Sequence, residues 1–406
     1  MIYLRFIANL SFKLVFYHSG FMFGIKDANQ NKDLINLINQ FDTTILGIEN
    51  VKAQINGKKI NTYTLVYTPI GFFIISRLNL MRKCKAKIVV SLFDIIGFDF
   101  KSKNEILCRF GNSQTILLEI DNYKPFIQSI LDHHSQMFYR SPFIKPIELN
   151  NFPESLHPTQ PISPPSNIIS LRYISICAKY QQPIDPETKH IFEIYEKSDK
   201  LSITFNFKCQ PPINYHFISS PLMHEPLLHG LIFDQYSPHN VCKIIYSLLK
   251  YNKNIISIIM RNYNDLTYEQ FGFSNLKNPS VVSWHFSNLS LTDQRLSLFF
   301  MEFKSYQGDL IQLSLDHIHF TTTSADRLAK LIAFHHCFRS LEVFNLTYID
   351  GCGQNINKIL NSFQKTVSQL RSLQKVTFAN WNPQPSITSP PKPPNVKSSI
   401  QIPFQF

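Results

Sequence analysis

The sequence has few of the residues on which most cofactor and disulfide sites depend. It contains only 12 glycines in 406 residues, and it has no glycine-rich phosphate loop, no Gly-x-Ser-x-Gly turn and no His-Glu-x-x-His box. Its seven cysteines are odd in number and include no Cys-x-x-Cys pair. We therefore expect a non-enzymatic protein without a cofactor, a disulfide framework or a bound metal, located in the reducing cytoplasm.

Long apolar runs and charged residues are also scarce. The apolar stretch 1–24 is interrupted by Arg5, Asn9, Lys13 and His18, which favours a packed element or an extension over a membrane span or a secretory signal. The net charge is +12, and residues 1–141 hold 17 lysines and arginines against 10 acidic residues. This basic first third indicates an anionic partner, either a membrane surface or a nucleic acid, or else a solvated face without a ligand.

Proline divides the chain into segments. Two proline-rich stretches read as extended backbone, one in the middle and one at the end. The run Pro390–Pro394 is a candidate ligand for an SH3 or WW module, with a plain tail as the alternative. The predicted segments are an N-terminal extension (1–32), a first domain (33–141), a proline-rich linker (142–168), a second domain (169–382) and a proline-rich tail (383–406).

The first domain reads as short strands followed by one helix. Apolar stretches between about residues 51 and 120 are separated by turn-forming stretches such as Asn56-Gly57. Helical periodicity follows from Phe126 to His134. This order predicts a pleckstrin-homology-like β-barrel closed by a C-terminal helix.

The second domain repeats one pattern. Leu-x-x-Leu-x-Leu, with apolar substitutes, recurs six times at intervals of about 26 to 32 residues, with first positions at Leu228, Ile255, Val281, Leu310, Leu341 and Leu373. Helical periodicity lies between several copies, as in 241–249, 296–303 and 356–367. Such units must stack to bury their apolar faces. They predict an α/β leucine-rich repeat solenoid, a horseshoe of the ribonuclease-inhibitor type.

Two sets of residues are candidates for binding. Basic side chains near two predicted turns of the first domain could meet an anionic membrane, where each contributes about 1 kcal/mol. These are Lys58, Lys59, Arg77, Arg82, Lys83, Lys85 and Lys87. Residues that alternate with the buried strand positions form the predicted concave protein-binding face of the repeats. The candidate contact residues on this face are Asp234, Arg261, His285, Gln312, Asp316, Asn345 and Lys375.

Three stretches resemble the CARMIL family of leucine-rich repeat regulators of actin capping: Asp33–Asn39, Lys87–Asp99 and Leu171–Tyr195. The resemblance implies a pleckstrin-like domain that contacts anionic membrane and repeats that bind a protein. It therefore implies a scaffold of the actin cortex, peripheral at the plasma membrane, although no candidate capping-protein-binding segment is found. The alternatives are a repeat adaptor with no actin role, and nucleic-acid binding by the basic first domain. The last is disfavoured because the Arg82–Lys87 stretch has no aromatic residue.

Overall fold

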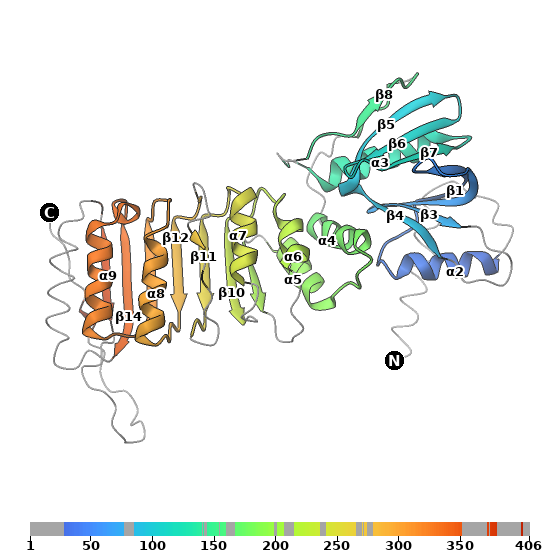
Figure 1. Cartoon of the computed structure of the whole chain (residues 1–406). Helices are drawn as coiled ribbons and strands as arrows, with labels where there is room; N and C mark the ends of the chain where they lie inside the picture. The colour runs from blue at the N-terminus through green and yellow to red at the C-terminus, as the bar shows by residue number, and fades with distance from the viewer. Residues whose placement is uncertain are drawn as a thin grey trace.

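The computed structural model contains two eight-stranded sheets with a layer of helices between them (Figure 1). The structure describes residues 28–76, 85–139, 141, 144–153, 155–159, 167–198, 201–206, 215–235, 241–264, 270, 272–273, 279–350, 372, 374–379 and 399–400. Among these residues, no helix has both the length and the apolar composition needed to cross a bilayer.

The first sheet is mixed, with its strands in the order β4-β3-β2-β1-β7-β6-β5-β8. Neighbouring strands are antiparallel, except that β5 and β8 run parallel. The chain turns after β1 through Asn56 and Gly57, whose φ angles are 49° and 73°, a conformation that these two residue types accept readily. The strands are β1 (Gly47–Ile55), β2 (Asn61–Thr68), β3 (Gly71–Ser76), β4 (Ala86–Ser91), β5 (Ile95–Ser102), β6 (Glu105–Phe110), β7 (Thr115–Glu119) and β8 (Glu148–Asn150).

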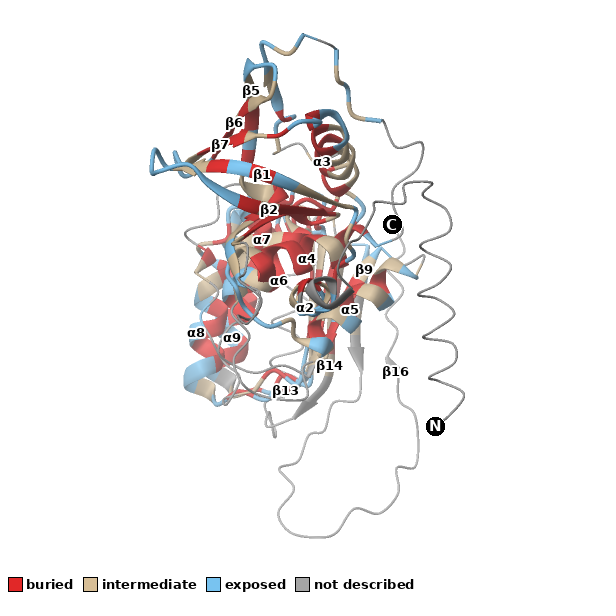
Figure 2. Cartoon of the chain, turned by 90° about the vertical axis from the view of Figure 1, so that its right-hand side faces the viewer, coloured by how far each residue is buried: buried red, intermediate tan, exposed pale blue. Residues whose placement is uncertain are grey.

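Helices α2 (Ala28–Asn39) and α3 (Tyr123–Met137) contribute to the core of this sheet, as do Ile174 and Ala178 of the helix Ile168–Lys179. Phe126 of α3 is fully buried against Tyr67, Phe72 and Phe98, with ring centroids 5.4 to 6.0 Å apart. Ile38 of α2 belongs to the same core. Figure 2 shows the buried residues gathered between α3 and the strands. Phenylalanine side chains therefore supply much of the packing between this helix and the sheet.

Three helices lie between the sheets: α4 (Ile168–Lys179), α5 (Pro186–Glu196) and α6 (Tyr215–Leu222), and the short helix η1 (Leu92–Asp94) contacts α4. Helix α4 packs on β4 and α3 on one side and on α5 and α6 on the other. Its Ser175 hydroxyl lies 2.8 Å from the Ser91 hydroxyl and donates to the Ile70 carbonyl at 2.8 Å. Its Lys179 forms an ion pair with Asp94 at 2.6 Å. Helix α4 therefore joins the two halves of the molecule.

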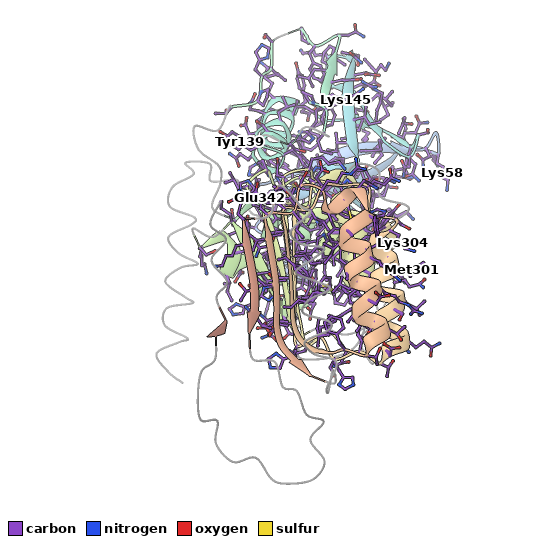
Figure 3. All side chains as sticks on the ribbon, turned by 90° about the vertical axis from the view of Figure 1, so that its left-hand side faces the viewer. Lys58, Tyr139, Lys145, Met301, Lys304 and Glu342 are labelled. Atoms are coloured by element: carbon purple, nitrogen blue, oxygen red, sulfur yellow. The ribbon has the colours of Figure 1, made fainter. Side chains whose placement is uncertain are left out.

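The second sheet has seven parallel strands in chain order, with β16 antiparallel at the edge beside β15. The repeat pattern predicted its register, because Leu231, Ile258, Trp284, Leu313 and Phe344 form one continuous row of paired positions. Helices α7, α8 and α9 lie on one side of this sheet (Figures 1 and 3). The elements are β9 (Ser202–Asn206), β10 (Gly230–Gln235), α7 (Val241–Tyr251), β11 (Ser257–Arg261), β12 (Ser283–Ser287), α8 (Asp293–Phe303), β13 (Gln312–His319), α9 (Thr322–Phe334), η3 (His336–Phe338), β14 (Val343–Asp350), β15 (Lys375–Ala379) and β16 (Ser399–Ile400).

The predicted fold class is wrong. In place of a pleckstrin-homology-like barrel, the first half forms an open sheet whose order ends at β4 and β8, which do not pair with each other in the described residues. In place of a leucine-rich repeat horseshoe, the second half forms a parallel sheet with helices on one side, and no solenoid is evident in the part of the chain that the structure describes. The molecule is an α/β protein with two sheets. The repeat interval and the apolar periodicity specify which strand residues pair. They do not specify whether the first sheet closes into a barrel or whether the second sheet curves into a horseshoe, and both predictions failed on that point.

The division into domains stays a prediction. Strand β8 lies inside the stretch predicted as a linker, and it pairs with β5 through Gly97, Phe98 and Asp99. The predicted extension and the predicted tail fall almost entirely outside the described residues, as does the helical pattern at 356–367.

Candidate binding face

One side of the parallel sheet presents a polar surface. Along each strand, alternate residues point to the helices and are buried, while the intervening residues point to the other side and are mostly half-buried or exposed. We call this second set the open face. Its members are Ser202, Thr204, Ile232, Asp234, Ser257, Ile259, Arg261, Ser283, His285, Ser287, Gln312, Ser314, Asp316, Val343, Asn345, Thr347, Lys375 and Thr377. The open face therefore contains all seven residues predicted for the binding face.

An ion pair joins two neighbouring strands of the open face, β10 and β11. Arg261 Nη1 on β11 lies 3.1 Å from Asp234 Oδ2 on β10, and the two side chains are 46% and 33% exposed. Since both side chains remain accessible, the pair contributes little to stability. It leaves adjacent charges of both signs on the surface, which suits contact with polar and charged groups of another molecule.

A second polar group is centred on Asp316 of β13. Its carboxylate accepts hydrogen bonds from Thr347 Oγ1 at 2.6 Å and from Ser287 Oγ at 3.3 Å, and it lies 3.0 Å from His317 Nδ1. These contacts come from three neighbouring strands, β12, β13 and β14. The carboxylate is therefore held in place before any partner arrives, which lowers the entropic cost of binding.

His285 lies on β12 between the two groups. Burial lowers the pKa of this histidine, Asp316 acts in the opposite direction, and Arg261 lowers it further. The imidazole is therefore mainly neutral at pH 7, with one nitrogen donor and one acceptor. Next to it along the row, Asn345 Nδ2 donates to Ser314 Oγ at 3.0 Å. The row of paired positions His285, Ser314 and Asn345 is thus uncharged and rich in hydrogen-bonding groups.

Two members of the predicted set are less connected. Among the described residues Gln312 makes only a long 3.4 Å contact with Ser314 Oγ, and Lys375 is exposed at β15. The structure therefore brings Asp234 together with Arg261 and places His285 close to Asp316, while Lys375 has no ion pair within the described residues.

Three residues in the left-handed conformation lie at or near the ends of β11, β12 and β13, outside the predicted set. Asn262, Asn288 and His317 have φ of 59°, 55° and 54°. Asn262 Nδ2 donates to the Asp234 carbonyl at 3.2 Å, and its Oδ1 accepts from Asn288 Nδ2 at 2.9 Å. Each residue stands two positions after the third apolar position of its repeat, which is Met260, Phe286 or Leu315, so the repeat alignment carried a signal for it. Asparagine is the non-glycine residue that tolerates this backbone conformation best.

Four of the seven basic residues predicted to bind a membrane lie in the part of the chain that the structure describes. Lys58 and Lys59 are exposed in the β1–β2 turn, and Lys85 and Lys87 are exposed at the start of β4. Strand pairing brings both segments to the same end of the first sheet, where Figure 3 labels Lys58. No ion pair to any of the four is found among the described residues. Arg77, Arg82 and Lys83 lie outside them.

The histidines do not gather into a metal site in the described residues, where no group of three metal-ligating side chains is found. Buried cysteines there carry free thiols, as in Cys108 and Cys337, and burial raises the pKa of Cys337 to about 12. Such a thiol is chemically inert at neutral pH.

Comparison with known proteins gives no family. No protein-family model matches the sequence, and no curated protein matches it. The class that the structure defines is an α/β protein with a parallel sheet and an open polar face. The resemblance to the CARMIL family stays a prediction and depends on the three sequence stretches alone.

Proposed function

We propose that this protein is a non-enzymatic scaffold that holds a partner protein on the open face of its parallel sheet. One observation supports this most: helices α7, α8 and α9 all lie on the same side of the sheet. All-parallel sheets are almost always covered on both faces. A face that extends over β9 to β15 without a described helix above it is therefore a surface that another molecule can cover.

The composition of the open face favours a protein over a nucleic acid. Two aspartates stand among its strands, and Arg261 is already paired with one of them. Carboxylates would repel a phosphate backbone, whereas a mixture of both charges, hydroxyls and amides is typical of the polar part of a protein interface.

Attachment to an anionic membrane is the second part of the proposal. It is supported by the exposure of Lys58, Lys59, Lys85 and Lys87 at one end of the first sheet. Clustered lysines give weak binding that falls as salt rises. The CARMIL resemblance supports an actin-regulatory partner at the cell cortex; a nucleic acid at these lysines is the competing function.

Affinity capture from cell extract tests the open face. The charge-reversed double variant Arg261→Glu/Asp316→Lys keeps the net charge of the chain and changes only the pattern on this face. Proteins that bind wild type should be depleted at least tenfold with this variant. The matched control is Asp326→Lys/Lys330→Glu, which reverses an exposed 2.7 Å ion pair on α9, on the other side of the sheet. If both variants capture the same proteins as wild type, the open face is not the binding surface.

Vesicle co-sedimentation tests the lysines separately. The variant Lys58→Glu/Lys59→Glu/Lys85→Glu/Lys87→Glu should lose binding to vesicles with 30% phosphatidylserine. The control Lys101→Glu/Lys103→Glu alters the β5–β6 turn, at the opposite end of the sheet. Binding that ignores lipid charge, together with lysine-dependent retention of a labelled single-stranded RNA, would favour the nucleic-acid function instead.

A further inference from the structure

A second surface feature lies on the helical side of the molecule, away from the open face. An open groove of about 440 Å³ runs between α6 and α7. Its lining includes Tyr215 and His216 of α6, Met223 just after α6, and Tyr246, Lys250 and Tyr251 of α7. The volume lies within the range, roughly 300 to 1,000 Å³, of sites that receive a ligand or a large side chain.

The walls of the groove are aromatic and its only fixed charge is positive. Three tyrosines and a methionine provide apolar surface that adapts to the shape of an inserted group. Lys250 supplies the cation, with its Nζ 5.1 Å from the Tyr251 ring centroid. Neither residues 215–224 of the first wall nor residues 241–251 of the second include an acidic residue, and Lys253 follows just after α7. A ligand that suits this groove has an apolar body and negative charge.

The groove is held open by buried contacts beneath it. Asn252, 2% exposed, follows α7 and donates from Nδ2 to the carbonyls of Leu222 and Glu225, at 3.1 and 2.9 Å. These bonds tie the end of α7 to the end of α6. His224, which also lines the groove, lies 2.8 Å from the hydroxyl of Ser141. The two helices therefore keep their separation without a ligand, which is the preorganisation that favours binding.

From this geometry we infer that the groove binds an acidic segment of a partner protein that inserts one large apolar side chain between α6 and α7. The aromatic walls receive the side chain, and Lys250 at the rim meets a carboxylate of the segment. A membrane surface would meet the same charge, but a flat bilayer does not fill a groove between two helices. The concave shape therefore favours a peptide over a lipid surface.

Peptide selection on the intact protein tests this inference without knowledge of the natural partner. A library of random 12-residue peptides displayed on phage is selected on wild type, and the enriched peptides are synthesised with a fluorescein label. We expect them to combine two or more acidic residues with Trp, Phe or Leu. Fluorescence anisotropy then measures the Kd for wild type, Ser247→Phe, Lys250→Glu and Lys243→Glu. Ser247 lines the groove, so phenylalanine there fills it without a change in charge.

The inference requires Ser247→Phe and Lys250→Glu to weaken peptide binding at least tenfold. Lys243→Glu is the matched control, because Lys243 lies two turns earlier on α7, is exposed and is not part of the lining; it should change Kd less than twofold. Circular dichroism confirms that all variants are folded. Selection of no acidic peptide, or equal binding to all variants, would overturn the inference. So would Ser247- and Lys250-dependent binding to phosphatidylserine vesicles in the absence of peptide binding.

Discussion

Arg172 and Glu225 form a buried ion pair that joins α4 to the turn after α6. Arg172 Nη1 lies 3.4 Å from Glu225 Oε2, and the two side chains are 0% and 10% exposed. Arg172 also donates from Nε to the Met137 carbonyl at 2.7 Å and from Nη1 to the Pro221 carbonyl at 3.3 Å. One guanidinium thus contacts α3, α6 and the turn before β10. Burial lowers the pKa of Arg172 to about 10, so the group is still a cation at neutral pH.

Loss of Arg172 should destabilise the protein strongly. In Arg172→Met the apolar volume stays similar, but Glu225 is left buried without its cation. We expect the free energy of unfolding to fall by about 3 to 5 kcal/mol, as found when one partner of a buried pair is removed. Urea denaturation followed by circular dichroism measures it.

A second variant separates the charge from the packing. Arg172→Met/Glu225→Gln removes both charges and should recover more than half of the lost stability, because the amide can still accept from the Leu227 N–H. Lys52→Ala, which breaks the exposed pair with Glu119, is the surface control and should leave the denaturation midpoint unchanged. Equal losses in the single and the double variant would assign the effect to packing alone.

The protein should lose stability as the pH falls from about 6.5 to about 4. Burial lowers the pKa of both His134 and His224 to about 4, and Arg172 adds to the effect at His224. Since the unfolded chain protonates these imidazoles near pH 6.5, it binds protons first as the pH falls, and the folded state is penalised by about 3 kcal/mol for each histidine by pH 4. Below pH 4 both states are protonated and the loss levels off.

Urea denaturation of wild type and His134→Leu at pH 7.5, 5.5 and 4.5 checks this dependence. The variant should show a smaller decrease than wild type, whereas His190→Leu, an exposed control, should not differ from it. Burial raises the pKa values of the Glu49, Glu196 and Glu302 carboxyls above 4.5. The folded state therefore binds these protons at a higher pH than the unfolded chain does, which stabilises the fold as the pH falls toward about 4.5. That opposite effect is common to all variants and cancels in the comparison. Parallel curves for wild type and His134→Leu would show that His134 does not cause the loss.

The register of the parallel sheet was predictable from the sequence because the same buried apolar positions recur in each repeat. Trp284 pairs with Ile258 on one side and with Leu313 on the other, each at the same place in its repeat. The open face follows from the same alternation, which is why Arg261 and Asp316 lie on the same side of the sheet. The helices α7 and α8 were predicted from apolar spacing, whereas α9 was not.

The relations between distant segments could not be predicted. Nothing local to Arg172 indicates that it meets Glu225, 53 positions later, although one arginine within an apolar helix such as Ile168–Lys179 does signal a buried partner. The pairing of β8 with β5 has the same limitation. Turn residues predict hairpins between consecutive strands, but they do not predict that β8 pairs with a strand far from it in the sequence. The groove between α6 and α7 also depends on tertiary packing, since its two walls are separate in the sequence.

The aromatic core behind the parallel sheet should be sensitive to truncation. Phe299 of α8 is fully buried, with its ring centroid 4.7 Å from Phe286 and 5.4 Å from Phe303. Phe299→Ala leaves a cavity between helix and sheet and should lower the free energy of unfolding by about 3 to 5 kcal/mol. Phe334→Ala is the matched control, because that phenylalanine is 80% exposed at the end of α9, and it should stay within about 0.5 kcal/mol of wild type. Urea denaturation distinguishes the two; similar losses would mean that α8 is not packed on the sheet as described.

The turn after β11 should depend on the conformation of Asn262 as well as on its hydrogen bonds. In Asn262→Ala, a residue with a Cβ and no polar side chain must adopt a φ of 59°, which costs about 1 to 2 kcal/mol. The bonds to the Asp234 carbonyl and to Asn288 are lost as well, at about 1 kcal/mol each. Asn262→Gly loses the same bonds but accepts the backbone conformation, so the glycine variant should be more stable than the alanine variant by about 1 kcal/mol. Thermal and urea denaturation of both variants measure the difference. If glycine and alanine prove equally destabilising, the hydrogen bonds alone account for the asparagine; if glycine is clearly better, the left-handed turn that follows Arg261 is what selects it, and the same order is expected at Asn288, whose φ is 55°.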